Sequence, residues 1–252
     1  MSASNVPFPD HFSRVASAYA AFRPRYPAML FERLASLAPG NRAAWDCGSG
    51  SGQAARGLAE HFEVVWATDA SGAQLASAPE HPRIHYRVAP AEASGLEAGA
   101  VDLVTVAQAL HWFDRPRFYA EARRVLRPRG VVAAWCYDLM QVTPEIDALI
   151  HGFYTDTIGR YWPPERALVE ARYETIEFPF DPIAVPSVNM DAEMDLNELA
   201  GYMRTWSAVT RYREAIGRDP VIDLIHELEP IWGAHETRRR VRWPLAMLAG
   251  RA

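Results

Sequence analysis

The residues best suited to bind a ligand stand in one short stretch, AAWDCGSGSGQAARGL, at positions 43–58. An apolar run ends in an acidic residue, Asp46, and three glycines follow at alternate positions, Gly48, Gly50 and Gly52. Glycine lets the backbone turn tightly and approach a ligand closely, and the start of the next helix offers free N–H groups. Because Asp46 would repel a phosphate, we expect a ligand that carries positive charge.

A second acidic residue, Asp69, ends the next predicted strand, EVVWATDAS. In open α/β sheets ligands bind at the carboxyl ends of the strands, so Asp69 should lie beside the glycine loop. A carboxylate in that place can accept hydrogen bonds from both hydroxyls of a ribose. S-adenosylmethionine carries a ribose, a sulfonium and an ammonium group, and therefore suits Asp46 and Asp69 together.

A dinucleotide is the competing ligand, because Gly50, Gly52 and Ala55 can be aligned with the dinucleotide-binding fingerprint. That alignment leaves Gly48 without a role. It also puts Asp46 near a pyrophosphate, a like-charge contact that costs on the order of 1 kcal/mol or more. The chain further lacks a clear proton relay for hydride transfer. We therefore favour S-adenosylmethionine over a nicotinamide cofactor.

The elements that must position these residues alternate between strand and helix. We expect strands at 43–47, 63–71, 83–89, 100–110 and 131–138, and helices at 28–37, 52–62, 72–79 and from 115 up to Pro128. This alternation predicts a doubly wound, mostly parallel α/β sheet with right-handed crossovers. A helix is also expected from residue 10. Later in the chain we expect helices at 144–161, 194–217 and 220–233, and strands at 172–180 and 237–252.

Length and composition limit the function classes. The 252 residues show no repeat or linker, so we expect one domain over 1–252, with a helical lid at 1–40, a cofactor-binding core at 41–138, and sheet completion with capping helices at 139–252. The net charge of −5 argues against a nucleic-acid partner, and no run approaches the roughly 18 apolar residues of a membrane span. Two isolated cysteines and scattered histidines give no metal site. We expect a cytoplasmic protein that acts on a small molecule, as a monomer or alternatively a dimer.

The chain resembles the class I S-adenosylmethionine-dependent methyltransferases in five motifs, at 46–52, Asp69, 91–92, 108–113 and 126–130. The resemblance implies a Rossmann-like sheet of seven strands with S-adenosylmethionine as cofactor and no metal. A narrower likeness, to the group that includes trans-aconitate methyltransferase, rests on RPRYP at 23–27 and YMRTWSAVTRYRE at 202–214. It implies an N-terminal helical lid. The cofactor-binding residues implied are Tyr19, Arg23, Asp46, Gly48, Ser49, Gly50, Asp69, Ala70, Ala91, Glu92 and Gln108.

His111 is the candidate catalytic residue, because it follows the fourth strand where an acceptor should meet the methyl group. The candidate substrate-binding residues are Trp112, Tyr137, Arg204 and Trp206. A carboxylate acceptor is already nucleophilic and needs only a clamp such as arginine, and this is the acceptor we favour. A phenol, amine or carbon acid would need His111 as a general base. A non-catalytic S-adenosylmethionine-binding protein is the alternative of another class, although Gly50 and Asp69 are both retained.

Overall fold

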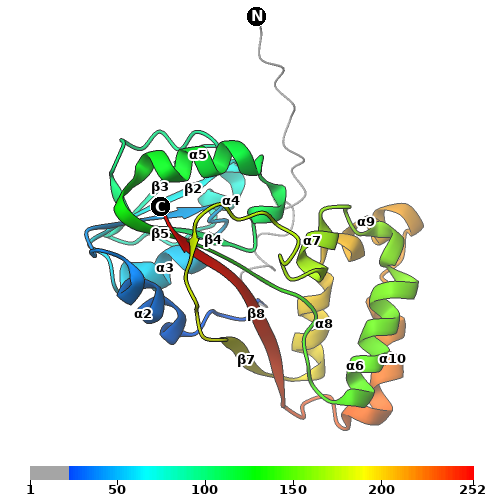
Figure 1. Ribbon diagram of the computed structural model, residues 1–252. Coiled ribbons are helices and arrows are strands. Elements are labelled where there is room, and N and C mark those ends of the chain that lie inside the picture. The colour runs from blue at the N-terminus through cyan, green and yellow to red at the C-terminus, as the bar shows by residue number, and fades with distance from the viewer. Residues whose placement is uncertain (1–22) are drawn as a thin grey trace, which may run out of the picture.

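An eight-stranded sheet organises the computed structural model, which describes residues 23–252 (Figure 1). The strand order is β3-β2-β1-β4-β5-β8-β6, with β7 also paired to β8. The first five strands run parallel, and β8 is antiparallel to β5, β6 and β7. The strands are β1 (Ala43–Cys47), β2 (Val64–Asp69), β3 (Ile84–Val88), β4 (Val101–Ala107), β5 (Leu126–Tyr137), β6 (Asp181–Pro182), β7 (Asn189–Met194) and β8 (Arg239–Arg251). The predicted doubly wound α/β fold is confirmed, and β6 and β7 are two strands that the sequence analysis did not predict.

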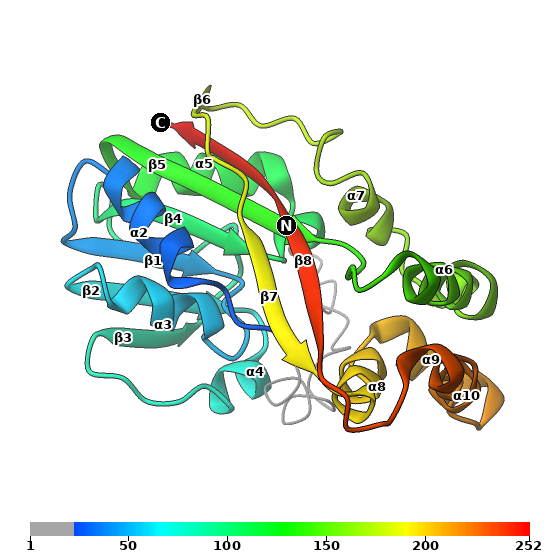
Figure 2. The ribbon, with the colours of Figure 1, turned by 90° about the horizontal axis from the view of Figure 1, so that it is seen from below.

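Helices cover both faces of the sheet. Helices α2 (Ala28–Leu37) and α3 (Gln53–Ala59) lie on one face, and α5 (Arg115–Val125) lies on the other (Figures 1 and 2). The short α4 (Gly72–Ala76) follows β2. Every residue of β1 is buried, as expected of a parallel strand covered on both faces. Side chains that alternate along the strands therefore feed two hydrophobic clusters, one on each face.

The second half of the chain builds a helical cap beside β8, with α6, α8, α9 and α10 grouped away from the parallel strands (Figures 1 and 2). Asp195 starts α8 with a capping box, because its side chain accepts from the Glu198 amide and the Glu198 side chain accepts from the Asp195 amide. The cap elements are α6 (Pro144–Gly152), η2 (Phe153–Thr157), η3 (Gly159–Tyr161), α7 (Arg166–Glu170), α8 (Leu196–Arg204), α9 (Ser207–Ile216) and α10 (Val221–Trp232). A further short turn, η1 (Leu110–Trp112), follows β4.

Three expectations for this half are wrong. The segment 172–180 is not a strand, because Arg172 and Tyr173 adopt positive φ values of 53° and 62° that an extended chain cannot take. The helix expected over 144–161 ends at Gly152 and continues as a π turn and a 3₁₀ turn. The helix expected over 194–217 is interrupted between α8 and α9. The predicted helix from residue 10 and Tyr19 lie outside the described residues.

Candidate active site

The loop between β1 and α3 depends on its glycines. Gly48, Gly50 and Gly52 have φ values of +69°, +55° and +76°, which residues with a side chain rarely adopt. A Cβ at Gly48 would lie only 2.7 Å from the Cβ of Ala109. A Cβ at Gly50 would instead point toward open space, since its nearest neighbour, the Oε1 of Gln74, is 3.8 Å away. The loop therefore packs tightly at Gly48 and leaves room for a ligand at Gly50.

Asp69 holds this loop at the adjacent strand end. Its Oδ2 accepts from the Gly50 amide at 2.9 Å, and its Oδ1 accepts from the Ser71 amide at 2.8 Å. Burial raises the pKa of Asp69, and these two amides oppose the rise. Each carboxylate oxygen has a second lone pair, so Asp69 can accept further hydrogen bonds from a ligand in the cavity it lines.

A cavity of about 1060 Å³ opens at the carboxyl ends of β1, β2 and β4. It is large enough for a nucleoside-sized cofactor. Ser49 lines it and has a buried hydroxyl that finds no hydrogen-bond partner in the described part of the chain. The predicted cofactor-binding residues that line this cavity are Gly48, Ser49, Gly50, Asp69, Ala70, Ala91, Glu92 and Gln108.

Asp46, by contrast, does not line the cavity, and the expectation that it meets the cofactor directly is corrected. It is fully buried beneath the glycine loop, where the Thr105 hydroxyl donates to its Oδ1 at 2.9 Å. Its Oδ2 has no hydrogen-bond partner within residues 23–252. Burial raises the pKa of Asp46 to about 7, against the opposing effects of Thr105 and the Ala55 amide. Its influence on a ligand is therefore electrostatic and indirect.

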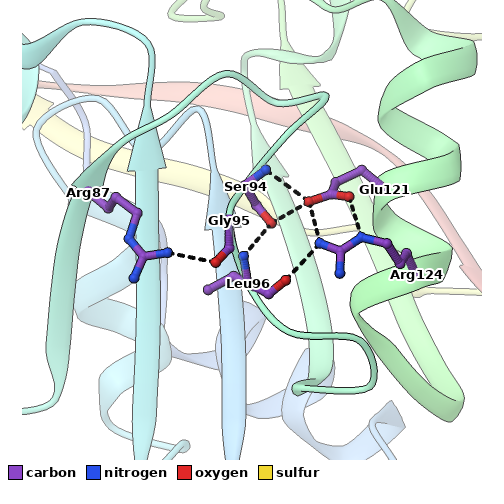
Figure 3. Close-up of polar contacts among 6 residues, drawn as sticks. All are labelled: Arg87, Ser94, Gly95, Leu96, Glu121 and Arg124. Atoms are coloured by element: carbon purple, nitrogen blue, oxygen red, sulfur yellow. Dashed lines mark hydrogen bonds and ion pairs between the residues drawn. The ribbon is translucent and has the colours of Figure 1, made fainter.

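The loop from 89 to 99, which forms one wall of the cavity, is fastened to α5 (Figure 3). The Oε1 of Glu121 accepts from the amide and the hydroxyl of Ser94, at 2.9 and 2.5 Å. Arg124 pairs with the same carboxylate at 2.7 Å and donates to the Leu96 carbonyl at 2.7 Å. The hydrogen bond from Arg124 is the main cause that lowers the pKa of Glu121 to about 2. This charged pair keeps residues 89–93 against the cavity.

A second, smaller cavity of about 80 Å³ lies between the sheet edge and the helical cap. It shares Gln108, Trp112 and Tyr137 with the first cavity, so a ligand in one can meet a ligand in the other. The side-chain amide of Gln108 donates to the Tyr137 carbonyl at 2.9 Å and accepts from its amide at 3.1 Å, which aligns the ends of β4 and β5. The other residues that line the second cavity are Arg23, His111, Asp138, Leu139, Trp162, Pro163, Arg166, Tyr202, Thr205, Trp206 and Ser207.

The structure puts two arginines, Arg23 and Arg204, in places other than those predicted from the sequence. Arg23 was expected at the cofactor, but it lines the second cavity, donates to the Tyr137 hydroxyl and lies over the Tyr202 ring at 5.6 Å. Arg204 was expected to bind substrate, but it lines neither cavity. It forms a partly exposed ion pair with Asp219 at 2.6 Å. Arg204 ends α8 of the helical cap, and its side chain is held by Asp219 outside both cavities.

Arg166 also lines the second cavity, and the sequence analysis did not select it. Its Nη2 donates to Asp138 at 2.6 Å and its Nε donates to the Tyr154 hydroxyl at 2.7 Å. Its guanidinium lies 4.8 Å from the centre of the Trp162 ring, a cation–π distance. Neither Arg166 nor Trp162 belongs to a periodic pattern, since both follow the irregular turns η2 and η3. The WPPER run at 162–166 was the only local signal.

His111 lines the second cavity and is buried. Its Nδ1 lies 2.9 Å from the hydroxyl oxygen of Tyr173, and its ring is 4.9 Å from that of Trp112. Burial, together with the positive charges of Arg166 and Arg115, lowers the pKa of His111 to about 3. The imidazole is therefore neutral at physiological pH.

Residues 23–252 contain neither a cluster of metal ligands nor a membrane-spanning helix. No group of three or more His, Cys, Asp and Glu side chains is arranged there to hold a metal ion. No helix in that range is long and apolar enough to cross a membrane.

The sequence is similar to those of known methyltransferases. A family model described as a methyltransferase domain covers residues 45–134. A Dictyostelium discoideum protein named as a methyltransferase is 37% identical over 221 residues, covering 86% of this chain and 84% of its own. The Saccharomyces cerevisiae protein CRG1, named as an S-adenosylmethionine-dependent methyltransferase, is 27% identical over 251 residues, covering 84% of this chain and 86% of its own.

A solved structure gives the same result. A protein from Anaeromyxobacter dehalogenans, described as a type II methyltransferase, is 48% identical and superposes with a TM-score of 0.86. The match covers 91% of this chain and 98% of that one. These relatives are named as methyltransferases in general, so the narrower likeness to the trans-aconitate group stays a prediction.

The raised pKa of Asp46 predicts a pH-dependent stability. The folded protein retains a proton on Asp46 between its ordinary pKa of 3.8 and about 7, whereas the unfolded chain has lost it. The contribution of Asp46 to the free energy of unfolding therefore falls as pH rises through this window. Urea unfolding across the window should show wild type losing stability relative to Asp46→Asn. A constant difference between the two proteins would contradict the assignment.

The contacts of Glu121 with Ser94 and Arg124 predict a stability that changes with pH in the opposite direction. Its carboxylate stabilises the fold at neutral pH, and this stabilisation is lost as pH falls from 4.5 toward about 2. Glu121→Gln should therefore lower the free energy of unfolding more at about pH 7 than near pH 3. Asp191→Asn is the control, because Asp191 pairs with Arg240 and Arg242 on an exposed surface, where ion pairs contribute little. An equal loss for both variants at neutral pH would rule out a special role for Glu121.

Proposed function

Since the chain belongs to the class I S-adenosylmethionine-dependent methyltransferases, we propose that it transfers the methyl group to a carboxylate of a small organic acid. The first cavity would hold the cofactor and the second the acceptor. The observation that carries the choice of acceptor is the charge of the second cavity. It combines fixed arginine charge with a histidine that stays neutral.

The residues of the first cavity fit the cofactor. The open space at Gly50 admits a chain close to the backbone, and the Asp69 carboxylate is positioned for the ribose hydroxyls. The loop at Ala91 and Glu92 would border the adenine. When bound, S-adenosylmethionine supplies the methyl group on a sulfonium leaving group. The protein residues bind it, orient the acceptor and exclude water.

Three features of the second cavity favour an anion. Among the described lining residues, Arg23 and Arg166 are cationic and only Asp138 is anionic, which leaves one positive charge in excess. The indole N–H of Trp162 is buried and has no hydrogen-bond partner in the described structure. The rings of Trp162 and Trp206 supply apolar walls. A small carboxylate with an apolar body satisfies the charge, the donor and the walls together.

His111 gives a reason to prefer a carboxylate over acceptors that must lose a proton. A group with a pKa of about 3 is a weak base at neutral pH and is poorly matched to a phenol, an amine or a carbon acid. A carboxylate is already ionised and presents its lone pair without proton removal. The general-base alternative therefore fits this geometry less well.

The experiment that tests the proposal is a panel assay with labelled S-adenosylmethionine. Small carboxylic acids, phenols and primary amines are offered in parallel, and base-labile label in the product identifies a methyl ester. Methylation of carboxylic acids alone is the expected outcome. Methylation of phenols or amines would overturn the choice of acceptor. Tight binding of S-adenosylhomocysteine without turnover of any class would favour the non-catalytic alternative.

Asp69→Ala should weaken the binding of S-adenosylhomocysteine by about 2–4 kcal/mol, because a charged acceptor loses its bonds to two ribose hydroxyls. Calorimetry measures the change. Asp102→Ala is the control, since Asp102 is also buried and accepts from two backbone amides, Arg42 and Ala43, but at the opposite end of β1. We expect that control to lose stability and keep its affinity. Unchanged affinity in folded Asp69→Ala would refute the ribose assignment.

Arg166→Gln should raise the KM for the acceptor about tenfold or more, because a carboxylate loses a charge-assisted partner in a desolvated cavity. The affinity for S-adenosylhomocysteine should not change. Arg204→Gln is the matched control: Arg204 is also a cap arginine paired with an aspartate, yet it lies outside both cavities. Equal acceptor KM values for the two variants would contradict a role for Arg166 in binding.

A further inference from the structure

We propose that Tyr173 is a positioning residue that fixes the proton of His111 on Nε2, so that the imidazole meets the acceptor as a hydrogen-bond donor. The role of the donor rests on the proposed function, whereas the position of the proton does not. In this role His111 does not act as a base, and its Nε2–H group orients an oxygen of the acceptor.

The contact between the two side chains is close and shielded from water. The Tyr173 hydroxyl oxygen lies 2.9 Å from the Nδ1 of His111. Tyr173 is fully buried and His111 is 8% exposed, so water does not compete for this hydrogen bond. With Nδ1 engaged, Nε2 is the ring nitrogen that remains for a ligand in the second cavity, which His111 lines.

The direction of the hydrogen bond follows from what surrounds the hydroxyl. His111 belongs to η1, and the first amides of a helical turn have no partner inside it. Burial raises the pKa of the Tyr173 hydroxyl well above its ordinary value, and the neighbouring amides of Leu110 and His111 oppose this rise only in part. The hydroxyl thus keeps its proton. Within residues 23–252 the Nδ1 of His111 is the hydrogen-bond partner of this fully buried hydroxyl, so a hydroxyl that keeps its proton satisfies it by donating to Nδ1. The neutral imidazole then carries its own proton on Nε2.

The backbone that delivers Tyr173 is strained, which supports a specific role. Arg172 and Tyr173 both adopt left-handed φ values, a conformation that bulky residues avoid. Such strain persists only where the surrounding structure determines it, and it gathers at functional sites. Here the Tyr173 amide donates to the Leu168 carbonyl at 2.9 Å, and the tyrosine ring is packed in the cluster on the α5 face. The turn brings the hydroxyl to the start of η1.

The charges around His111 agree with a donor role. Burial, together with the positive charges of Arg166 and Arg115, disfavours a second proton on the ring, so it remains neutral. The Nε2–H group then adds to the donors of the second cavity, Arg166 and the indole of Trp162. Donors on several sides select an acceptor that offers lone pairs. An ammonium group offers none, so this cavity would reject it.

Nitrogen NMR on protein labelled with ¹⁵N-histidine tests the position of the proton without any ligand. The signal of His111 is assigned by its loss in His111→Gln. We expect a neutral ring with the proton on Nε2 throughout the range from about pH 5 to pH 8. A proton on Nδ1, or a titration of this ring within that range, would overturn the proposal.

Tyr173→Phe tests whether Tyr173 sets the tautomer. Removing the donor to Nδ1 should raise the share of the Nδ1–H form about tenfold. Tyr119→Phe is the matched control, because it removes another largely buried hydroxyl, one that donates at 2.9 Å to the Glu177 carbonyl and not to a histidine. A tautomer ratio in Tyr173→Phe equal to that of wild type would refute the positioning role. If that variant does not fold, the wild-type spectrum still decides where the proton lies.

These outcomes separate the two proposals. A wild-type protein that methylates no carboxylic acid would overturn the proposed acceptor and leave the assignment of the proton intact. A wild-type spectrum with the proton on Nδ1 would do the reverse.

Discussion

The hydrogen bond from the Gly50 amide to the Asp69 carboxylate is the constraint on which the cofactor cavity depends. It joins the loop after β1 to the end of β2, and it requires the glycine loop to stay in a conformation that side chains rarely permit. The parallel register of the two strands brings Asp69 to the level of the loop. One carboxylate therefore shapes the loop and lines the first cavity. A substitution at Asp69 removes its bond to the Gly50 amide as well as the proposed bonds to the ribose.

The second cavity depends on a different constraint, the antiparallel pairing of β8 with β5. This pairing, together with β7, puts the helical cap beside the carboxyl end of β5, where Gln108 joins β4 to Tyr137. Two cavities with shared walls result. The described residues common to both cavities are Gln108, Trp112 and Tyr137. The parallel core thus forms the first cavity, and the helical cap supplies much of the wall of the second.

The sequence was sufficient where function follows backbone pattern. The alternation of strands and helices predicted the sheet, and glycine spacing with Asp69 predicted the first cavity. It was insufficient where a side chain's direction decides, as for Asp46 below the loop and Arg204 outside the cavity. It was also insufficient for Arg166 and Tyr173, which irregular turns deliver. Positive φ values at an arginine and a tyrosine are imposed by tertiary packing and leave no local pattern to read.

Desolvation shifts the pKa values of buried groups near both cavities, Asp46 beneath the first and His111 in the second. Burial favours the neutral form of each group that can become neutral, so it raises the pKa of Asp46 to about 7 and lowers that of His111 to about 3. Arginine cannot respond in this way, because its guanidinium stays charged. Arg166 is tolerated in its buried position since Asp138, Tyr154 and the Trp162 ring replace the water it has lost. The second cavity therefore keeps the positive charge of its arginines at neutral pH, where His111 is uncharged. The carboxylate acceptor that we propose would pair with this charge and would not need to lose a proton.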